Sequence, residues 1–123
     1  MIDSYKDLIV WQRAMDIAKG VYKIAKLLPK DELFVLSSQM RRAAISIPSN
    51  IAEGQARNSS KEFRNFLSVA KGSAAELETQ LLLCVEIGYC KEEDIVGVLS
   101  LIAEVAKMIN AIQTKLLDKQ LSE

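Results

Sequence analysis

The 123-residue sequence contains no histidine, and it has only two cysteines, two prolines and five glycines. Without histidine, imidazole acid–base catalysis and histidine ligation of a metal are excluded. The two thiols, Cys84 and Cys90, predict neither a zinc site nor a disulfide framework. Because glycine and proline are so few, there is little turn material, which disfavours a fold of many β-strands.

Signals for targeting are also missing. The N-terminus has no basic stretch followed by an apolar core, so it does not resemble a signal peptide. The uninterrupted apolar runs fall far below the roughly 18 residues of a membrane span. We therefore expect a cytoplasmic protein that has no membrane partner.

What the sequence does have is four amphipathic helical patterns. Half of its residues are hydrophobic and 26% are charged, a composition typical of a globular chain. Apolar residues recur every three or four positions and predict helices at about residues 7–28, 31–54, 60–88 and 91–117. Pro48 is expected to kink or split the second helix. The short polar turns favour an all-α, up-down four-helix bundle that forms a single domain over residues 1–123.

Single residues predict where the first two helices and the last one begin and end. Pro29 is expected to end the first helix, and Asp31 to cap the start of the second. Gly54 is expected to stop the second helix, whereas Gly72, inside the third, is expected to mark close contact with a neighbouring helix. The tail after about Leu117 is expected to fray.

The third helix carries signals at both of its ends. Ser59 or Ser60 followed by Glu62 is a pattern typical of an N-cap. Gly88 suits the C-terminal end of a helix, where a left-handed residue is common. Both ends of this helix are therefore well defined by the sequence.

The first two helices have more apolar surface than one bundle core uses. In the first, two apolar stripes lie side by side, and Trp11 and Tyr22 belong to the second of them. In the second, residues 37–52 contain only two charges and many small residues, which allow close approach of helices. Such a surplus is typical of an oligomer interface.

The net charge is zero, which excludes a protein that works purely as a polycation. The charges are nevertheless segregated along the chain. Residues 1–36 have a net charge of +1, residues 37–72 of +4 and residues 73–123 of −5. The middle of the chain is therefore basic, and its second half is acidic.

Three basic residues follow a helical spacing around the turn between the second and third helices. Arg57, Lys61 and Arg64 lie at i, i+4 and i+7, and such a patch can contact phosphates. The alternative is that Arg57 pairs with Glu53, four residues earlier, and that the other two form an ordinary solvated face. Spacing alone does not decide between these interpretations.

Arg41 and Arg42 lie in a stretch that has no other charge, so their partial burial is expected. Three roles stay open for them: pairing with Glu76 or Glu78 of the third helix, lining the pore of an oligomer, or binding phosphate. The candidate nucleic-acid-binding residues are therefore Arg41, Arg42, Arg57, Lys61 and Arg64.

No catalytic constellation is recognisable in the sequence. The serines have no histidine or substitute lysine beside them in the pattern of a nucleophile and its base. There is no Glu-x-x-His motif, which disfavours a di-metal carboxylate bundle. We expect a protein that is not an enzyme and that uses no metal and no cofactor.

A long motif in the second helix resembles a known family. The stretch SQMRRAAISIPSNIAEG at residues 38–54 looks like the signature of the 23S ribosomal-RNA intervening-sequence proteins, which are four-helix bundles. The resemblance continues in EFRNFL at residues 62–67 and AKGSAAELE at residues 70–78. It also includes YKDLIVW at residues 5–11 and IGY at residues 87–89, so it covers nearly the whole chain.

This resemblance implies a small bacterial protein of poorly defined biochemical role. It also implies similarity to the accessory variability proteins of diversity-generating retroelements. Those proteins form a barrel-like pentamer of four-helix bundles, bind nucleic acid through basic surfaces and partner a reverse transcriptase. A ring-like homo-oligomer of five copies would use the surplus apolar faces and repeat the basic patch five times. The neutral net charge departs from the strongly positive surface of those proteins.

Two functions are expected from these observations. The first is a non-enzymatic, homo-oligomeric accessory protein, a homopentamer, that binds RNA or DNA weakly. The alternative is a structural or protein-interaction scaffold that binds no nucleic acid. Its recognition surface would be the acidic third and fourth helices, and its partner a reverse transcriptase or another protein.

Overall fold

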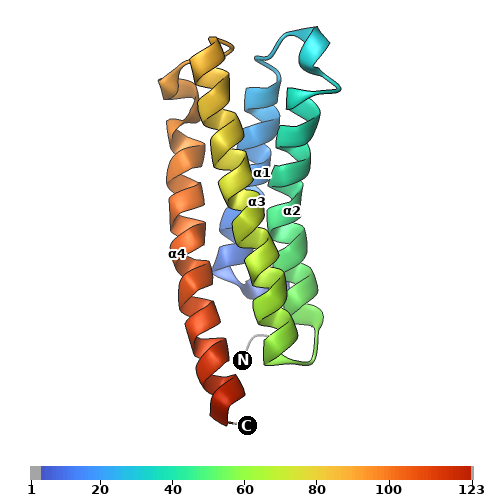
Figure 1. Cartoon of the computed structure of the whole chain (residues 1–123), viewed down its shortest axis with the longest axis vertical. Coiled ribbons are helices and arrows are strands. Elements are labelled where there is room, and N and C mark those ends of the chain that lie inside the picture. Colours follow the sequence, from blue (N-terminus) through green and yellow to red (C-terminus); the bar gives the residue numbers. More distant parts are fainter. Residues whose placement is uncertain (1–3, 123) are drawn as a thin grey trace.

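The computed structural model describes residues 4–122, and this part of the chain is helical and contains no strand (Figure 1). Four helices run up and down in turn, and two 3₁₀ turns precede the first two of them. The elements are η1 Tyr5–Asp7, α1 Ile9–Ala25, η2 Lys30–Glu32, α2 Leu36–Ala56, α3 Ser60–Ile87 and α4 Glu92–Ser122. The predicted all-α fold is confirmed. Residues 1–3, part of the N-terminus in which no signal peptide was expected, and residue 123 lie outside the described residues.

The four helices surround a single apolar core. α1 packs on α2 and α4, and α3 packs on the same two helices, so the bundle is square in section. The residues that fill the core recur at the three- and four-residue spacing seen in the sequence. The largest fully buried side chains include Ile17, Met40, Ile47, Ile51, Leu67, Leu77, Leu81 and Ile109. Each such side chain stabilises the fold by about 1.5–3 kcal/mol relative to an exposed position.

The first helix ends earlier than predicted, and the second begins later. α1 ends at Ala25, and the N–H of Leu28 then donates to the Ala25 carbonyl at 3.2 Å in a tighter turn. Because the residue before Pro29 disfavours helical geometry, the chain leaves the helix a few residues ahead of it. Asp31 lies in η2, and the N-cap position of α2 is Val35, which makes no side-chain cap bond. The prediction for Asp31 was therefore wrong, because a separate turn lies between it and α2.

The second helix runs without a break through its proline (Figure 1). Pro48 removes one backbone hydrogen bond, to the Ala44 carbonyl, and both residues are buried, so packing holds the helix together. Of the kink or split predicted at Pro48, the split does not occur. Gly54 does not stop the helix, which continues to Ala56. Gly54 is buried instead, and a Cβ at this position would lie 2.7 Å from the Cβ of Phe66.

The ends of the third helix agree with the sequence, whereas the fourth helix is longer than predicted. Ser59 Oγ accepts a hydrogen bond from the N–H three residues later at 3.0 Å, and Gly88 has a positive φ of 91°. α4 does not fray after Leu117 but continues to its last described residue. A reason is that Gln120 Oε1 accepts a hydrogen bond from Arg64 Nη1 at 3.0 Å, which ties the end of α4 to α3.

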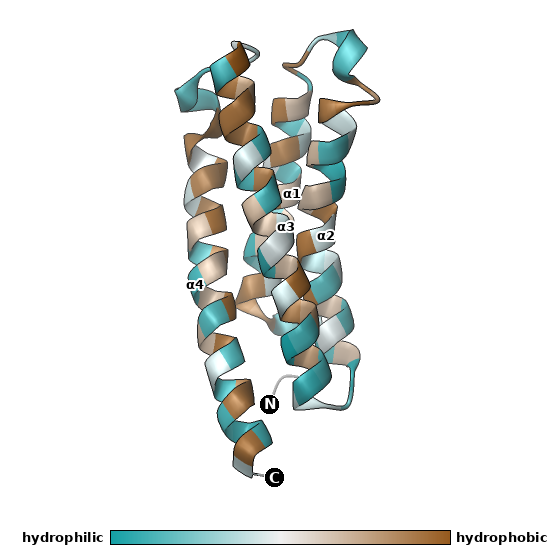
Figure 2. Cartoon of the chain, in the orientation of Figure 1, coloured by the Kyte–Doolittle hydropathy of each residue, from teal (hydrophilic) through white to brown (hydrophobic). Residues whose placement is uncertain are grey.

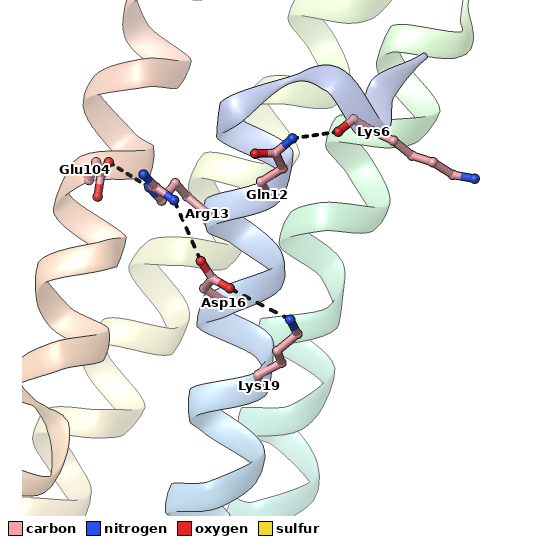
Figure 3. Close-up of polar contacts among 6 residues, drawn as sticks. All are labelled: Lys6, Gln12, Arg13, Asp16, Lys19 and Glu104. Carbon is pink, nitrogen blue, oxygen red and sulfur yellow. Dashed lines mark hydrogen bonds and ion pairs between the residues drawn. The ribbon is translucent and has the colours of Figure 1, made fainter.

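Polar contacts hold the outer side of α1 (Figure 3). Arg13 Nε donates to Glu104 Oε1 of α4 at 3.1 Å, and Arg13 Nη1 lies 3.9 Å from Asp16 Oδ2. Asp16 Oδ1 in turn lies 3.9 Å from Lys19 Nζ. Half-exposed pairs of this kind each contribute less than about 1 kcal/mol, so they help to align α1 with α4 more than they stabilise the bundle.

The fourth helix is strongly apolar. Its most apolar 18-residue window has a mean hydropathy of 1.9, so by length and composition alone α4 could cross a membrane. In the bundle, one stripe of α4 is buried against α1 and α3, namely Ile95, Val98, Ile102, Val105 and Ile109. Only 28% of the window is buried, so much of its apolar surface faces outward.

Apolar grooves stay open on several sides of the bundle, and they include one between α1 and α4 and two on opposite sides. The α1/α2 groove has a volume of about 400 Å³ and is lined by residues that include Trp11, Met15, Ile45 and Pro48. The α3/α4 groove, about 410 Å³, lies near the turn between those helices. Figure 2 shows that the upper part of α3, beside this turn, is rich in hydrophobic residues. The surplus apolar surface predicted for α1 and α2 is present, and α3 and α4 carry a second one that the sequence analysis did not single out.

Candidate nucleic-acid interface

The five predicted basic residues fall into two groups at different heights of the bundle. Arg41 and Arg42 lie in the first half of α2, near η2. Arg57 is the C-cap residue of α2, with extended backbone, and Lys61 and Arg64 lie in the first two turns of α3. Arg57 belongs to no turn of α3, so the helical spacing of the three residues does not by itself place them on one face.

Arg41 is bound to the backbone and not to an acidic residue. Its Nε donates to the Ser37 carbonyl and its Nη2 to the Leu33 carbonyl, both at 3.2 Å. Neither Arg41 nor Arg42 forms an ion pair with Glu76 or any other acid within residues 4–122. The predicted pairing with Glu76 or Glu78 is therefore wrong. Arg41 fixes the segment that leads into α2, and Arg42 is exposed.

Arg57 is held by three neighbours. Its Nη2 lies 3.0 Å from Glu53 Oε1, and its Nη1 lies 3.8 Å from Glu62 Oε1. The guanidinium also lies over the ring of Phe66, 5.0 Å from the ring centre, in a cation–π arrangement. The expected alternative, pairing with Glu53, is present in the structure. The two carboxylates compensate much of the charge of Arg57, so Arg57 alone is a weak phosphate ligand.

Arg64 joins the third helix to the fourth. Besides the hydrogen bond from its Nη1 to Gln120, its carbonyl accepts one from Gln113 Nε2 at 3.1 Å. Its Nε is buried and has no acceptor in the part of the chain that the structure describes. Arg64 therefore has a structural role as well as a charge. Replacing it would disturb the end of α4 as well as any ligand.

The end of α4 adds cations that sequence reasoning did not place at this site. Arg57 and Lys119 line the same hollow of about 320 Å³, which we call the basic hollow; its other lining residues are Asn58, Ser59, Ser60, Phe63 and Leu116. Lys71 lies further along α3 and donates to Asn110 Oδ1 at 2.9 Å. The signal that could have found Lys119 is the antiparallel return of the fourth helix, which places its last turns beside the first turns of the third.

Charge is separated along the long axis of the bundle. At the end that holds the basic hollow, the basic residues Arg57, Lys61, Arg64, Lys115 and Lys119 outnumber the acidic residues Glu53, Glu62 and Asp118. At the opposite end, at η2 and the α3–α4 turn, the acidic residues Asp31, Glu32, Glu86, Glu92, Glu93 and Asp94 outnumber Lys23, Lys26, Lys30 and Lys91. A neutral chain thus presents one end at which phosphates are favoured over carboxylates.

The two cysteines offer no metal site. No group of three or more histidine, cysteine or acidic side chains within residues 4–122 is arranged to hold a metal ion. Cys84 is fully buried, and its Sγ lies 3.5 Å from the Met40 sulfur. Burial raises the pKa of the Cys84 thiol to about 11, and the nearby Cys90 and Glu32 add to the effect. Cys84 is therefore a neutral core residue at physiological pH.

Alkaline pH is expected to weaken the fold through this thiol. An unfolded thiol ionises near pH 9.0, whereas the folded one keeps its proton up to about pH 11, so stability falls as pH rises through this interval. Denaturant unfolding at pH 8 and pH 11 measures the effect. The stability difference between wild type and Cys84→Ala is expected to shift by on the order of 2 kcal/mol in favour of the variant. An unchanged difference would contradict the burial of a protonated thiol.

Four packed helices with a basic hollow at one end define a small all-α helical-bundle protein. Comparison with known families identifies the family of the chain. The family model for 23S rRNA-intervening sequence proteins matches residues 6–111, so the chain belongs to this family. No curated protein matches the chain.

A solved structure supports the same placement. It is the crystal structure of a protein of unknown function from the S23 ribosomal protein family of Bacteroides thetaiotaomicron VPI-5482. The two sequences are 27% identical, and the superposition covers 85% of this chain and 98% of that chain with a TM-score of 0.79. The resemblance to the family in the sequence is confirmed.

Proposed function

We propose that this protein is a non-enzymatic, homo-oligomeric accessory protein that binds structured RNA or DNA weakly through the basic end of its bundle. The observation that carries the proposal is the basic hollow, where Arg57 and Lys119 come from different helices to one surface. The N-terminus of α3, capped by Ser59, opens at this hollow, and the positive end of its dipole favours an anion there.

The partner class follows from the charge and from the comparisons. Phosphate contacts supply most of the affinity for nucleic acid and need no base-reading groups. The family description names 23S rRNA, and the similar structure is assigned to a ribosomal protein family, so a structured RNA is the first ligand to test. A ring of copies with parallel bundles would present several basic hollows on one side and so raise the avidity without new contacts.

Self-association is supported by the open α1/α2 groove. Trp11, Met15 and Ile45 line an apolar surface that runs along the bundle and contains few charges. An apolar surface left open on a small protein can serve as a contact with a partner. The molar mass from light scattering at micromolar concentration is expected to be several times 13.7 kDa, and the mass of a monomer would contradict the assembly.

Charge reversal at two free lysines tests the binding site. Lys61 and Lys119 are exposed, and neither forms an ion pair within residues 4–122, so the double variant Lys61→Glu with Lys119→Glu leaves the packing intact. Its affinity for RNA is expected to fall at least about tenfold at low salt.

The control for this experiment is the same change of charge away from the basic hollow, in Lys19→Glu with Lys107→Glu. Both lysines are exposed, and the control variant has the same net charge as the test variant. It is expected to lose much less affinity. Equal losses in the two variants would show that only net charge matters, and no loss in the test variant would exclude the basic hollow.

A further inference from the structure

An exposed apolar tip lies at the acidic end of the bundle, between η2 and α2. Phe34 is 88% exposed, and its neighbours Leu33 and Val35 are 43% and 56% exposed. Figure 2 shows this segment as a hydrophobic link at the upper right of the bundle. Three consecutive exposed apolar residues form a contiguous apolar patch, which a contact with a partner would bury.

The tip is held in place although its side chains face solvent. Arg41 Nη2 donates to the Leu33 carbonyl at 3.2 Å, and the N–H of Val35 donates to the Glu32 carbonyl at 3.1 Å. Tyr89, in the α3–α4 turn, donates from its hydroxyl to Glu32 Oε2 at 2.7 Å. A tip that is already ordered loses little further conformational entropy when it binds.

A matching apolar surface exists at the same height on the same molecule. The α3/α4 groove is lined by Leu82, Val85, Ile95, Val96 and Leu99, together with the acidic Glu86, Glu92 and Glu93. Leu82 is 48% exposed and Val96 is 62% exposed. Its volume of about 410 Å³ accommodates a phenylalanine with part of its neighbours.

The tip and the groove lie on opposite sides of the bundle. α1 and α2 form one side of the square and α3 and α4 the other, since each helix packs only on its neighbours in the square. η2 and the α3–α4 turn both lie at the top of Figure 1, on different sides of it. Two parallel copies placed side by side thus bring the tip of one to the groove of the next, which is a heterologous contact that can close into a ring.

Charge favours the same pairing. Around the tip, Lys23, Lys26 and Lys30 outnumber Asp31 and Glu32, and Glu32 is occupied by Tyr89. The groove presents three glutamates and no basic residue among those that line it. A basic surround on one copy therefore meets an acidic rim on the next.

We propose that Phe34 of one copy is seated in the α3/α4 groove of a second copy, and that this contact builds the homo-oligomer. The inference rests on the proposed self-association and specifies one contact that contributes to it, in addition to the α1/α2 groove. It also gives Arg41 a role: the residue holds the tip in its binding conformation and is not a phosphate ligand.

Light scattering of two single variants tests the contact. Phe34→Ser removes the tip and Val96→Glu blocks the groove, and both positions are exposed, so neither change disturbs the core. Each variant is expected to associate at least about tenfold more weakly than wild type. Leu121→Ser, an exposed leucine at the other end of the bundle, is the control and is expected to keep the wild-type mass. Far-ultraviolet circular dichroism confirms that each variant is folded.

Mixing the two variants gives the decisive result. Phe34→Ser keeps an intact groove and Val96→Glu keeps an intact tip, so an equimolar mixture is expected to form a one-to-one complex that neither forms alone. If wild type is oligomeric and Phe34→Ser keeps its mass, the tip contact is excluded while self-association stands. If Phe34→Ser dissociates but the two variants do not associate in the mixture, Phe34 contacts a surface other than the α3/α4 groove, and the groove is excluded. A monomeric wild type would exclude both proposals.

Discussion

Leu77→Ala is expected to lower the free energy of unfolding by about 3 kcal/mol. Leu77 is fully buried in the middle of α3, where the removal of a leucine side chain leaves a cavity that the helices on either side cannot fill. Denaturant unfolding at a fixed protein concentration measures the loss. The fixed concentration is needed because self-association adds to apparent stability by mass action.

The control for this variant lies on the same helix. Leu83→Ala changes the same chemistry at a position that is 45% exposed, so its cost is expected to stay below about 1 kcal/mol. Equal losses in the two variants would contradict the placement of the core side of α3. The two leucine-to-alanine substitutions change the helix propensity of α3 equally. The difference between their effects therefore measures the packing of the Leu77 side chain.

Gly54→Ala is expected to destabilise the bundle by about 2 kcal/mol. An added Cβ would lie 2.7 Å from Phe66 Cβ and 2.9 Å from Phe63 Cδ1, and a Cβ is fixed to the backbone, so α2 and α3 must move apart. Overpacking of this kind costs about 3 kcal/mol at most, offset by about 1 kcal/mol of improved helix propensity. Thermal or denaturant unfolding measures the net loss.

Gly72→Ala provides the contrast. Nothing lies within 4 Å of a Cβ at this position, so only the helix propensity changes, and the variant is expected to be more stable by up to about 1 kcal/mol. The substitution is the same in both variants, yet the expected effects have opposite signs. Destabilisation by Gly72→Ala, or stabilisation by Gly54→Ala, would contradict the α2–α3 contact that the structure shows.

The two glycines illustrate what the sequence predicts and what it does not. Periodicity predicted four helices and their buried faces, because those depend on local spacing that each helix carries by itself. Both glycine predictions were wrong: Gly54 was expected to end a helix and Gly72 to touch a neighbour, but the structure has the close contact at Gly54 and open space beside Gly72. Which glycine meets another helix depends on how α2 and α3 are rotated against each other, and a single sequence does not contain that rotation.

At the candidate site too, local spacing was predictable from the sequence, whereas contacts between distant helices were not. Spacing predicted a patch at Arg57, Lys61 and Arg64, and these residues do lie at one end of the bundle. Lys119 was missed, because it is far away in sequence and arrives only with the antiparallel return of α4. The partners of Arg41 were not predicted, because they are backbone carbonyls, which leave no charge pattern in a sequence.

The apolar tip at Phe34 was also missed. In the sequence, Leu33, Phe34 and Val35 lie between two helical patterns. Nothing in the sequence shows whether these three apolar residues are buried or exposed. The structure shows that η2 and Arg41 hold the backbone so that Phe34 points into solvent. The exposure of Phe34 in the structure is therefore what makes this loop a candidate contact.

The salt dependence of RNA binding is the measurement that tests the central claim most directly. A labelled structured RNA and a DNA duplex of the same length are titrated with the protein from low to physiological salt. We expect the logarithm of the affinity to fall linearly with the logarithm of the salt concentration, because each phosphate contact releases bound counterions. The double variant at Lys61 and Lys119 is expected to reduce the slope by about two. Absence of binding even at low salt, or binding that does not change with salt, would contradict a phosphate-binding function of the basic end.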